Sequence, residues 1–261
     1  MPEILEAEMY RRTAERALGR KIAEVRAPDA WYLKRGLTAD VARSALTGRR
    51  LEAARRIGKQ VLVDTSGGGP VLGLHFGMSG TLLVDGSAAI AKLEYVRGNE
   101  RPAWDRFALR FADGGDLVMR DARRLGAVEL DPDEGRWGID AMVVRPAELR
   151  NLLAGSVTPL KARLMDQSRL AGIGNLLVDE ILWRAGLDPA RPAGSLDAPE
   201  LRRLHHHLRA TLGELGGRGG SHTGDLHPAR ERGGVCPRDG APLVRRTVGG
   251  RTTYSCPVHQ R

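Results

Sequence analysis

The apolar residues of this 261-residue chain change their spacing once, and that change limits the fold more than any single motif. From residue 51 to about residue 130, short apolar runs alternate with glycine-rich turns, a pattern typical of β-strands. From Pro146 onward the spacing is helical. Six or more short strands indicate a β-sandwich or a flattened barrel. The sequence therefore predicts an α+β protein, with a β-sandwich followed by a helical part.

The strands expected in the first part are Gln60–Asp64, Val71–Phe76, Thr81–Val84, Arg106–Phe111, Leu117–Arg120 and Ala127–Leu130, preceded by a strand at Ile22–Trp31 and a helix at Thr38–Leu46. The helices expected in the second part are Pro146–Leu153, Leu160–Asp166, Asn175–Ala185 and Pro199–Leu215.

We expect four segments along the chain. Residues 1–130 form the β-sandwich domain with a leading amphipathic helix from Glu3 to Leu18. Residues 131–145, which include a proline and a glycine, form a linker. Residues 146–234 form the helical domain, whose glycine-rich, polar end from Gly216 to Gly234 is predicted to be a mobile loop. Residues 235–261 form a small β-hairpin between two cysteine-containing turns.

The composition favours a polyanionic partner. Lys and Arg number 41 against 32 Asp and Glu, which gives a net charge of +9 and a pI near 10.2. Nucleic acid is the simplest such partner, and a basic but indifferent surface is the alternative. No run approaches the ~20 apolar residues of a membrane span, and the start lacks a secretory apolar region, so we expect a cytoplasmic protein.

The first three residues, Met1-Pro2-Glu3, form a candidate catalytic pair. Proline is small enough for the initiator methionine to be removed, which leaves Pro2 with a secondary amine. An α-amino group titrates near pH ~8, so part of it is neutral and can form an imine with a sugar aldehyde carbon. Glu3 places an acid/base group beside that amine. The alternative is an ordinary start in which acidic residues favour the first helical turn.

Three turns carry residues suited to DNA. Lys59 precedes a strand, where a lysine either faces a phosphate or active site or simply lies at a solvated strand end. Met78 lies between glycines in a tight turn, and either inserts into a base stack or packs in a core. Arg123 and Leu125 lie in a second loop that can read one base edge and fill a gap in the stack.

The segment from Lys161 to Asn175 reads as helix, glycine-containing turn, helix. The amides and the side chain at Asn175, where the second helix begins, can bind a phosphate. An ordinary capped helix pair is the alternative.

The tail spaces four candidate metal ligands as Cys236-x-x-Asp239, sixteen residues, then Cys256-x-x-His259. This is the spacing of a zinc ribbon, and aspartate oxygen can replace one of the usual Cys or His ligands. No metal, or a disulfide between Cys236 and Cys256, are the alternatives, and a reducing cytoplasm disfavours the disulfide.

In combination these motifs resemble the formamidopyrimidine-DNA glycosylase/endonuclease VIII (Fpg/Nei) family, in the family's order and over nearly the whole chain. The motifs are the Met-Pro-Glu start, Gly-Lys59 before a strand, Gly-Met78-Ser-Gly, Arg-Arg-x-Gly at residues 123–126, the helix–two-turn–helix signature at 159–185 and the ribbon-like tail.

The resemblance implies a bifunctional DNA glycosylase/abasic-site lyase that repairs oxidised bases in duplex DNA, through an imine followed by β- and δ-elimination. It implies a DNA cleft between the two domains, a monomer, and one structural zinc ion. The implied roles are Pro2 as nucleophile at C1′, Glu3 as acid/base, Lys59 as a catalytically important phosphate contact, Met78 and Leu125 as wedges, Arg123 as the reader of the orphan base, and Lys161, Asn175 and Arg251 as phosphate contacts.

Three departures from the family pattern stand out. Leu5 replaces a second proline, Leu125 replaces a phenylalanine, and Asp239 and His259 replace two cysteines. The segment 216–225 lies where the family covers the everted base, but it does not identify the lesion. The competing hypotheses are a non-excising binder of damaged DNA on the same scaffold and a transcription-type helix-turn-helix protein.

Overall fold

The computed structural model describes residues 2–90 and 101–261, and the chain divides into two compact units. Unit 1 comprises Pro2 and residues 6–134, and unit 2 comprises residues 3–5 and 135–261. The division falls within the segment predicted as a linker. Helix α1 (Ile4–Glu15) begins in unit 2 and continues in unit 1.

Unit 1 contains two antiparallel sheets, which confirms the predicted β-sandwich. The strands of the first sheet, in spatial order, are β1 (Ile22–Arg26), β7 (Asp105–Phe111), β8 (Asp116–Arg120), β5 (Thr81–Val84) and β6 (Ser87–Ala88). Those of the second sheet are β2 (Leu51–Ile57), β3 (Gln60–Thr65), β4 (Leu72–His75) and β9 (Ala127–Leu130). The short helices beside them are η1 (Ala30–Tyr32), α2 (Ala39–Leu46) and η2 (Pro102–Trp104).

One apolar core holds unit 1 together. Side chains from both sheets meet in it, for example Val61 and Leu74 from one sheet and Phe107 from the other. Helix α1 contributes Tyr10, whose ring lies 4.3 Å from that of Phe76. Burial of such side chains is the main stabilising term of the sandwich.

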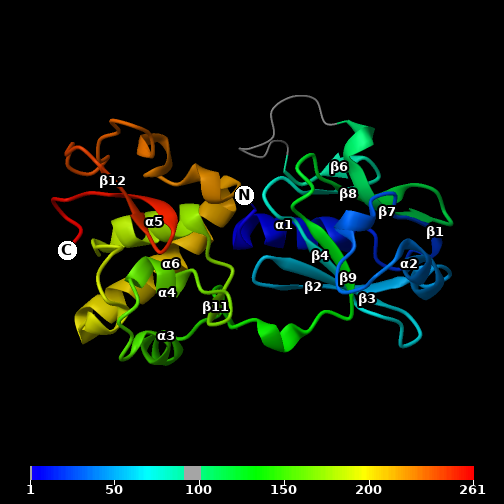
Figure 1. The fold of residues 1–261 in the computed structure, drawn as a ribbon, viewed down its shortest axis with the longest axis horizontal. Helices are drawn as coiled ribbons and strands as arrows, with labels where there is room; N and C mark the ends of the chain where they lie inside the picture. The colour runs from blue at the N-terminus through cyan, green and yellow to red at the C-terminus, as the bar shows by residue number, and fades with distance from the viewer. Residues whose placement is uncertain (1, 91–100) are drawn as a thin grey trace. The chain divides into compact units, whose positions relative to one another are not determined.

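Unit 2 is helical, as predicted (Figure 1). Its helices are α3 (Pro146–Leu153), α4 (Leu160–Leu164), α5 (Asn175–Ala185) and α6 (Ala198–Arg218), with 3-10 turns η4 (Ala193–Ser195), η5 (Ser221–Thr223) and η6 (His227–Ala229). Its strands are β10 (Ile139–Asp140), β11 (Leu170–Ala171), β12 (Val244–Val248) and β13 (Arg251–Ser255). A second apolar core joins α3 to α6 and includes Leu5. The hairpin β12–β13 is the predicted tail hairpin, drawn in red and orange in Figure 1.

Three local predictions need correction. The strand expected at Ile22–Trp31 ends at Arg26, and η1 follows it. The expected linker contains η3 (Glu134–Arg136) and β10, which pairs in parallel with β11. The glycine-rich segment predicted as a mobile loop is structured, because α6 continues to Arg218 and η5 and η6 follow.

A buried carboxylate explains why the glycine-rich segment from Gly216 to Gly234 is structured. Glu180 on α5 accepts hydrogen bonds from the amides of Asp225 and Leu226, at 3.1 and 2.9 Å. Leu226 is fully buried.

Within the described residues, no helix is long and apolar enough to cross a membrane.

Candidate active site

The N-terminal pair lies at the start of α1, where Pro2 is buried two residues before the helix begins. Glu3 is fully buried, and its carboxylate accepts hydrogen bonds from the amides of Gly174, Leu176 and Leu177 at 2.8, 2.8 and 3.2 Å. These are unpaired amides at the N-terminus of α5, where a helix stabilises negative charge. The sequence placed Glu3 beside Pro2, and the structure adds the helix that holds its side chain.

Gly174 is needed for this contact. A Cβ at residue 174 would lie 2.2 Å from Cδ of Glu3, which is closer than two carbons that are not bonded to each other can approach. The amides that we expected to bind a phosphate at the start of α5 therefore bind Glu3 instead. Asn175 remains as the candidate phosphate contact at this end, through its Nδ2 amide donor, while its buried Oδ1, an acceptor, has no hydrogen-bond partner in the described residues.

Lys59 lies in the two-residue turn between β2 and β3, directly before the strand as predicted. Ile57 pairs with Gln60 across this turn, and Gly58 adopts a positive φ of 54°. Arg56 donates to the carbonyl of Gly58 at 2.9 Å and so braces the turn. The half-buried Lys59 side chain is thus carried by a short and rigid hairpin.

One buried carboxylate holds the Met78 turn and the Arg123–Leu125 loop together. Asp121 is fully buried. Its Oδ1 accepts from the hydroxyl of Ser79 and the amide of Arg123, and its Oδ2 accepts from the amides of Leu125 and Gly126 at 2.9 and 2.8 Å. An aspartate that accepts from successive loop amides fixes the loop's conformation.

Glycine permits the two segments to touch. A Cβ at Gly77, whose φ is +56°, would lie 2.3 Å from the backbone carbonyl of Leu125. The half-buried Met78 and the 47% exposed Leu125 are therefore presented by one joined surface of unit 1. The sequence indicated these two side chains separately, but it did not indicate that Asp121 and Ser79 join them.

The two adjacent arginines of this loop have different surroundings. Arg124, at a φ of 56°, donates from Nε and Nη2 to the carboxylate of Asp29, both at 2.7 Å. These bonds hold the pKa of Asp29 below its ordinary value. Arg123 is exposed, and in the described part of the chain its guanidinium has no hydrogen-bond or ion-pair partner. Of the two arginines, Arg123 is therefore the one whose side chain is available to a ligand, and its role as reader of the orphan base stays a prediction.

Lys161 corrects a prediction, because it is fully buried rather than exposed to a phosphate. Its ammonium group donates to Asp179 at 2.8 Å, to the Thr253 hydroxyl at 2.8 Å and to the carbonyl of Thr252 at 3.0 Å. Burial lowers the pKa of Lys161, and Asp179 opposes that effect. An ammonium group has three hydrogens, so these bonds use its full donor capacity. Lys161 thus joins α4 to α5 and to β13.

The Lys161 contacts support the hairpin that carries Arg251. The turn Gly249–Gly250 has φ values of 57° and 73°, and Arg251 follows it, exposed, at the start of β13. A Cβ at Gly249 would lie 2.6 Å from Cβ of Ala162, so the turn packs directly on α4. Arg251 is accordingly presented at the tip of a hairpin fixed to the helices of unit 2.

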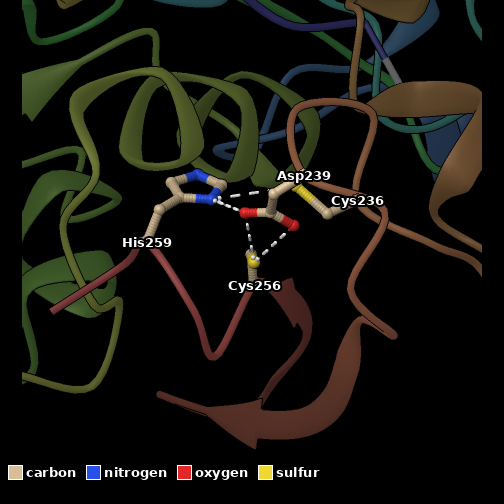
Figure 2. Close-up of side chains that lie close together, drawn as sticks. All are labelled: Cys236, Asp239, Cys256 and His259. Atoms are coloured by element: carbon tan, nitrogen blue, oxygen red, sulfur yellow. Dashed lines mark hydrogen bonds and ion pairs between the residues drawn. The ribbon is translucent and has the colours of Figure 1, made fainter.

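The four tail residues form one cluster. Side-chain atoms of Cys236, Asp239, Cys256 and His259 that can bind a metal ion all lie within 4.8 Å of one another (Figure 2). Both cysteines are buried and neither forms a disulfide, so the disulfide alternative is not realised. Hydrogen bonding to His259 holds the pKa of Asp239 well below its ordinary value, and burial raises the pKa of the Cys256 thiol.

The hydrogen bonds around this cluster are of the kind that orient metal-binding side chains. His259 points Nδ1 at Asp239, at 2.7 Å, and Nε2 at the carbonyl of Trp183, at 3.2 Å. Metal-binding histidines commonly use their second nitrogen in this way, which fixes the ring. The indole Nε1 of Trp183 also donates to Cys236 Sγ at 3.3 Å. The cluster can therefore hold one ion with two sulfur, one nitrogen and one oxygen ligand.

Known proteins are similar to this chain over its whole length. Residues 1–128 match the formamidopyrimidine-DNA glycosylase N-terminal domain, and residues 140–224 match the formamidopyrimidine-DNA glycosylase H2TH domain. Formamidopyrimidine-DNA glycosylases of Cereibacter sphaeroides and Paracoccus denitrificans are 38% and 36% identical to it, with each chain covered in full.

Solved structures agree. Lactococcus lactis Fpg in complex with DNA containing Fapy-dG has a TM-score of 0.82 at 26% identity, covering 99% of this chain and 100% of that one. MutM in complex with DNA containing carbocyclic 8-oxo-G has a TM-score of 0.83 at 26% identity, with both chains covered in full.

The fold and the matched domains define a DNA glycosylase of the base-repair class, with a β-sandwich and a helix–two-turn–helix domain. The chain belongs to the formamidopyrimidine-DNA glycosylase (Fpg/Nei) family, which confirms the resemblance seen in its sequence motifs.

Proposed function

We propose that this protein excises oxidised bases from damaged duplex DNA and then cleaves the strand at the resulting abasic site. The observation that carries the proposal is the buried Glu3 carboxylate, held by three α5 amides directly after Pro2 in the chain. Similar proteins bind DNA that contains Fapy-dG, 8-oxo-G analogues or an oxidised pyrimidine, which supports this substrate class.

Covalent catalysis would begin after removal of Met1. The Pro2 nitrogen attacks C1′ of the damaged nucleotide, the glycosidic bond breaks, and the base leaves with a proton. Opening of the sugar ring gives an iminium ion, which withdraws electrons from the sugar. Loss of the C2′ proton then breaks the C3′–O bond, and a second elimination breaks the C5′–O bond. Water finally releases Pro2, and Glu3 exchanges the protons in these steps.

Recognition in this proposal depends on eversion of the damaged base. Eversion costs a few kcal/mol, and protein side chains offset part of that cost by filling the vacated space. Met78 and Leu125, which Asp121 and Ser79 hold together, are suited to fill it. Arg123 is suited to read the base left on the opposite strand because its guanidinium is exposed. We assign phosphate contacts to Lys59, Asn175 and Arg251.

The tail cluster is proposed to bind one structural zinc ion. Zinc would link the two turns that carry Cys236 and Cys256 and so stabilise the hairpin that presents Arg251. It would take no part in the chemistry at C1′.

Borohydride trapping tests the catalytic proposal. With a duplex that contains an abasic site or an oxidised purine, the protein should become covalently linked to DNA when the imine is reduced. Pro2→Gly should abolish most of this product, and Pro102→Gly, at an exposed proline of the same unit, should leave it unchanged. Tight binding to damaged duplexes without trapping on any of them would instead identify a non-excising binder.

A lesion panel extends the test. Duplexes with oxidised purines and oxidised pyrimidines, each opposite all four bases, would define the substrate, and we expect oxidised purines to be excised fastest. Mass spectrometry should find Pro2 as the first residue of the active protein. Retention of Met1 in active protein would refute the mechanism.

A further inference from the structure

Trp31 is exposed to an unusual degree for its size. Its exposed fraction is 65%, and it is the only aromatic residue among the large exposed apolar side chains of residues 2–90 and 101–261. It lies in η1, which Asp29 caps by accepting from the amide of Trp31 at 3.1 Å. The cap fixes the backbone of the turn that carries this exposed indole, and nothing in the proposed function uses the indole.

The turn that carries Trp31 is joined to the Asp121–Gly126 loop. The same Asp29 carboxylate that caps η1 accepts both hydrogen bonds from Arg124. A Cβ at Gly126 would lie 2.1 Å from the hydroxyl of Tyr32, so the turn and the loop pack against each other. The framework that presents Arg123 and Leu125 therefore presents Trp31 as well.

Two basic residues, Lys34 and Arg35, follow Trp31 closely in the chain. Lys34 Nζ lies 4.3 Å from the centroid of the Trp31 ring, in a cation–π contact. Arg35 follows with a side chain that is 58% exposed and a backbone φ of 55°, a left-handed conformation that arginine rarely adopts. Two neighbouring carboxylates are paired, Asp29 with Arg124 and Glu129 with Arg35. A third, the exposed Asp131, lines the same groove as Lys34 and Arg35. The basic residues Lys34, Arg35 and Arg49 outnumber the carboxylates Glu129 and Asp131, so this surface carries a net positive charge.

A groove continues this surface. It has a volume of about 540 Å³, it is lined by Lys34, Arg35 and Arg49, and its apolar wall includes Leu37 and Val41. An aromatic platform beside a basic groove is the combination by which proteins bind single-stranded nucleic acid, with bases on the ring and phosphates along the groove. In an intact duplex the base faces are already stacked, so the platform favours an unpaired nucleotide.

We propose that Trp31, Lys34 and Arg35 form an accessory site for an unpaired nucleotide of the bound DNA, with the base stacked on Trp31 and its phosphate beside Lys34 and Arg35. The site rests on the proposed function to the extent that DNA is the ligand, and it lies outside the chemistry of Pro2 and Glu3. It would favour lesions near frayed ends, gaps or single-stranded tails over lesions in uninterrupted duplex.

Binding measurements on two DNAs test this site. Both contain the same stable abasic-site analogue. The first is a blunt duplex. The second is a series of duplexes with a single-stranded extension on either strand end and of different lengths. For the wild-type protein, the best extension should tighten binding about 5- to 100-fold, the range that one stacked base supplies. Trp31→Ala should remove most of this gain, whereas Trp31→Phe should keep a large part. The extended DNA should quench the tryptophan fluorescence of the wild-type protein through Trp31. This part of the quenching should be absent in Trp31→Phe.

Two results would overturn the site. One is a wild-type protein that binds extended and blunt DNA equally, and the other is a Trp31→Ala variant that keeps the full gain. Val157→Ala, at a valine 88% exposed in unit 2, is the matched control for loss of exposed apolar surface. Because binding to an abasic analogue needs no excision, failure of borohydride trapping would refute the catalytic proposal without affecting this one.

Discussion

Replacing Asp121 by asparagine tests whether one carboxylate organises both the Met78 turn and the Arg123–Leu125 loop, the two segments proposed to contact DNA. Its two oxygens accept four hydrogen bonds, from the Ser79 hydroxyl and from the amides of Arg123, Leu125 and Gly126. Asparagine keeps one accepting oxygen and turns an NH2 group toward the other donors. In either orientation at least one backbone N–H then faces another donor.

The magnitude follows from these bonds. A hydrogen bond to a charged group contributes ~1.5–3 kcal/mol, and a buried donor left without an acceptor adds a desolvation cost. Loss of one such bond and weakening of the others should lower the free energy of unfolding by about 2–4 kcal/mol. At roughly 2–4 °C per kcal/mol, the unfolding temperature of unit 1 should fall by roughly 5–15 °C.

The functional readout is discrimination among opposite bases. The ratio of trapping rates with each of the four opposite bases should flatten in Asp121→Asn, because Arg123 is no longer fixed. Ser79→Ala should give a smaller effect in the same direction, and the two substitutions should be non-additive because the side chains touch. Asp40→Asn, at a carboxylate 89% exposed on α2, is the control. An Asp121→Asn protein with wild-type stability and unchanged base discrimination would refute this role.

The remaining predictions concern three other contacts. Lys161→Met should destabilise unit 2 by about 1.5–3 kcal/mol, measured by chemical unfolding, since it removes a charged hydrogen bond to Asp179 and leaves Arg230 as the remaining cation on that buried carboxylate; an effect confined to DNA affinity would contradict the buried ion pair. Arg123→Ala should weaken opposite-base discrimination with little loss of stability, whereas Arg124→Ala should lower the unfolding temperature, and the reverse pattern would contradict the assignment. Arg251→Ala should reduce the slope of log affinity against log salt by about 1, and an unchanged slope would exclude a phosphate contact. Elemental analysis should find one zinc per chain, lost in Cys236→Ser, and a metal-free wild-type protein would exclude the zinc site.

The features predicted well from the sequence depend on neighbours along the chain. The alternation of apolar residues defined the strands of unit 1, and the Cys-x-x-Asp and Cys-x-x-His spacings brought four ligand atoms into one cluster. A strand or a turn is set largely by local residues, so its pattern can be read directly. The same holds for Lys59, which occupies the turn before β3 as expected.

The features that were missed depend on pairing between distant residues. The family resemblance implied a phosphate contact for Lys161, yet Asp179, 18 residues away, and Thr253, 92 residues away, supply its partners. Glu180 orders the glycine-rich segment from 46 residues away. Among these residues, only Asp121 is indicated by its local sequence, as a carboxylate directly before a loop whose amides can donate to it, and that pattern is common to many turns.

The bond between Glu3 and the start of α5 joins residues 171 or more positions apart. During synthesis, the third residue emerges from the ribosome long before the amides that receive its carboxylate exist. A truncated or half-finished chain would therefore carry the Pro2 amine without an oriented proton carrier beside it. Under the proposed mechanism, strand cleavage would require that translation has passed α5 and that this helix has folded.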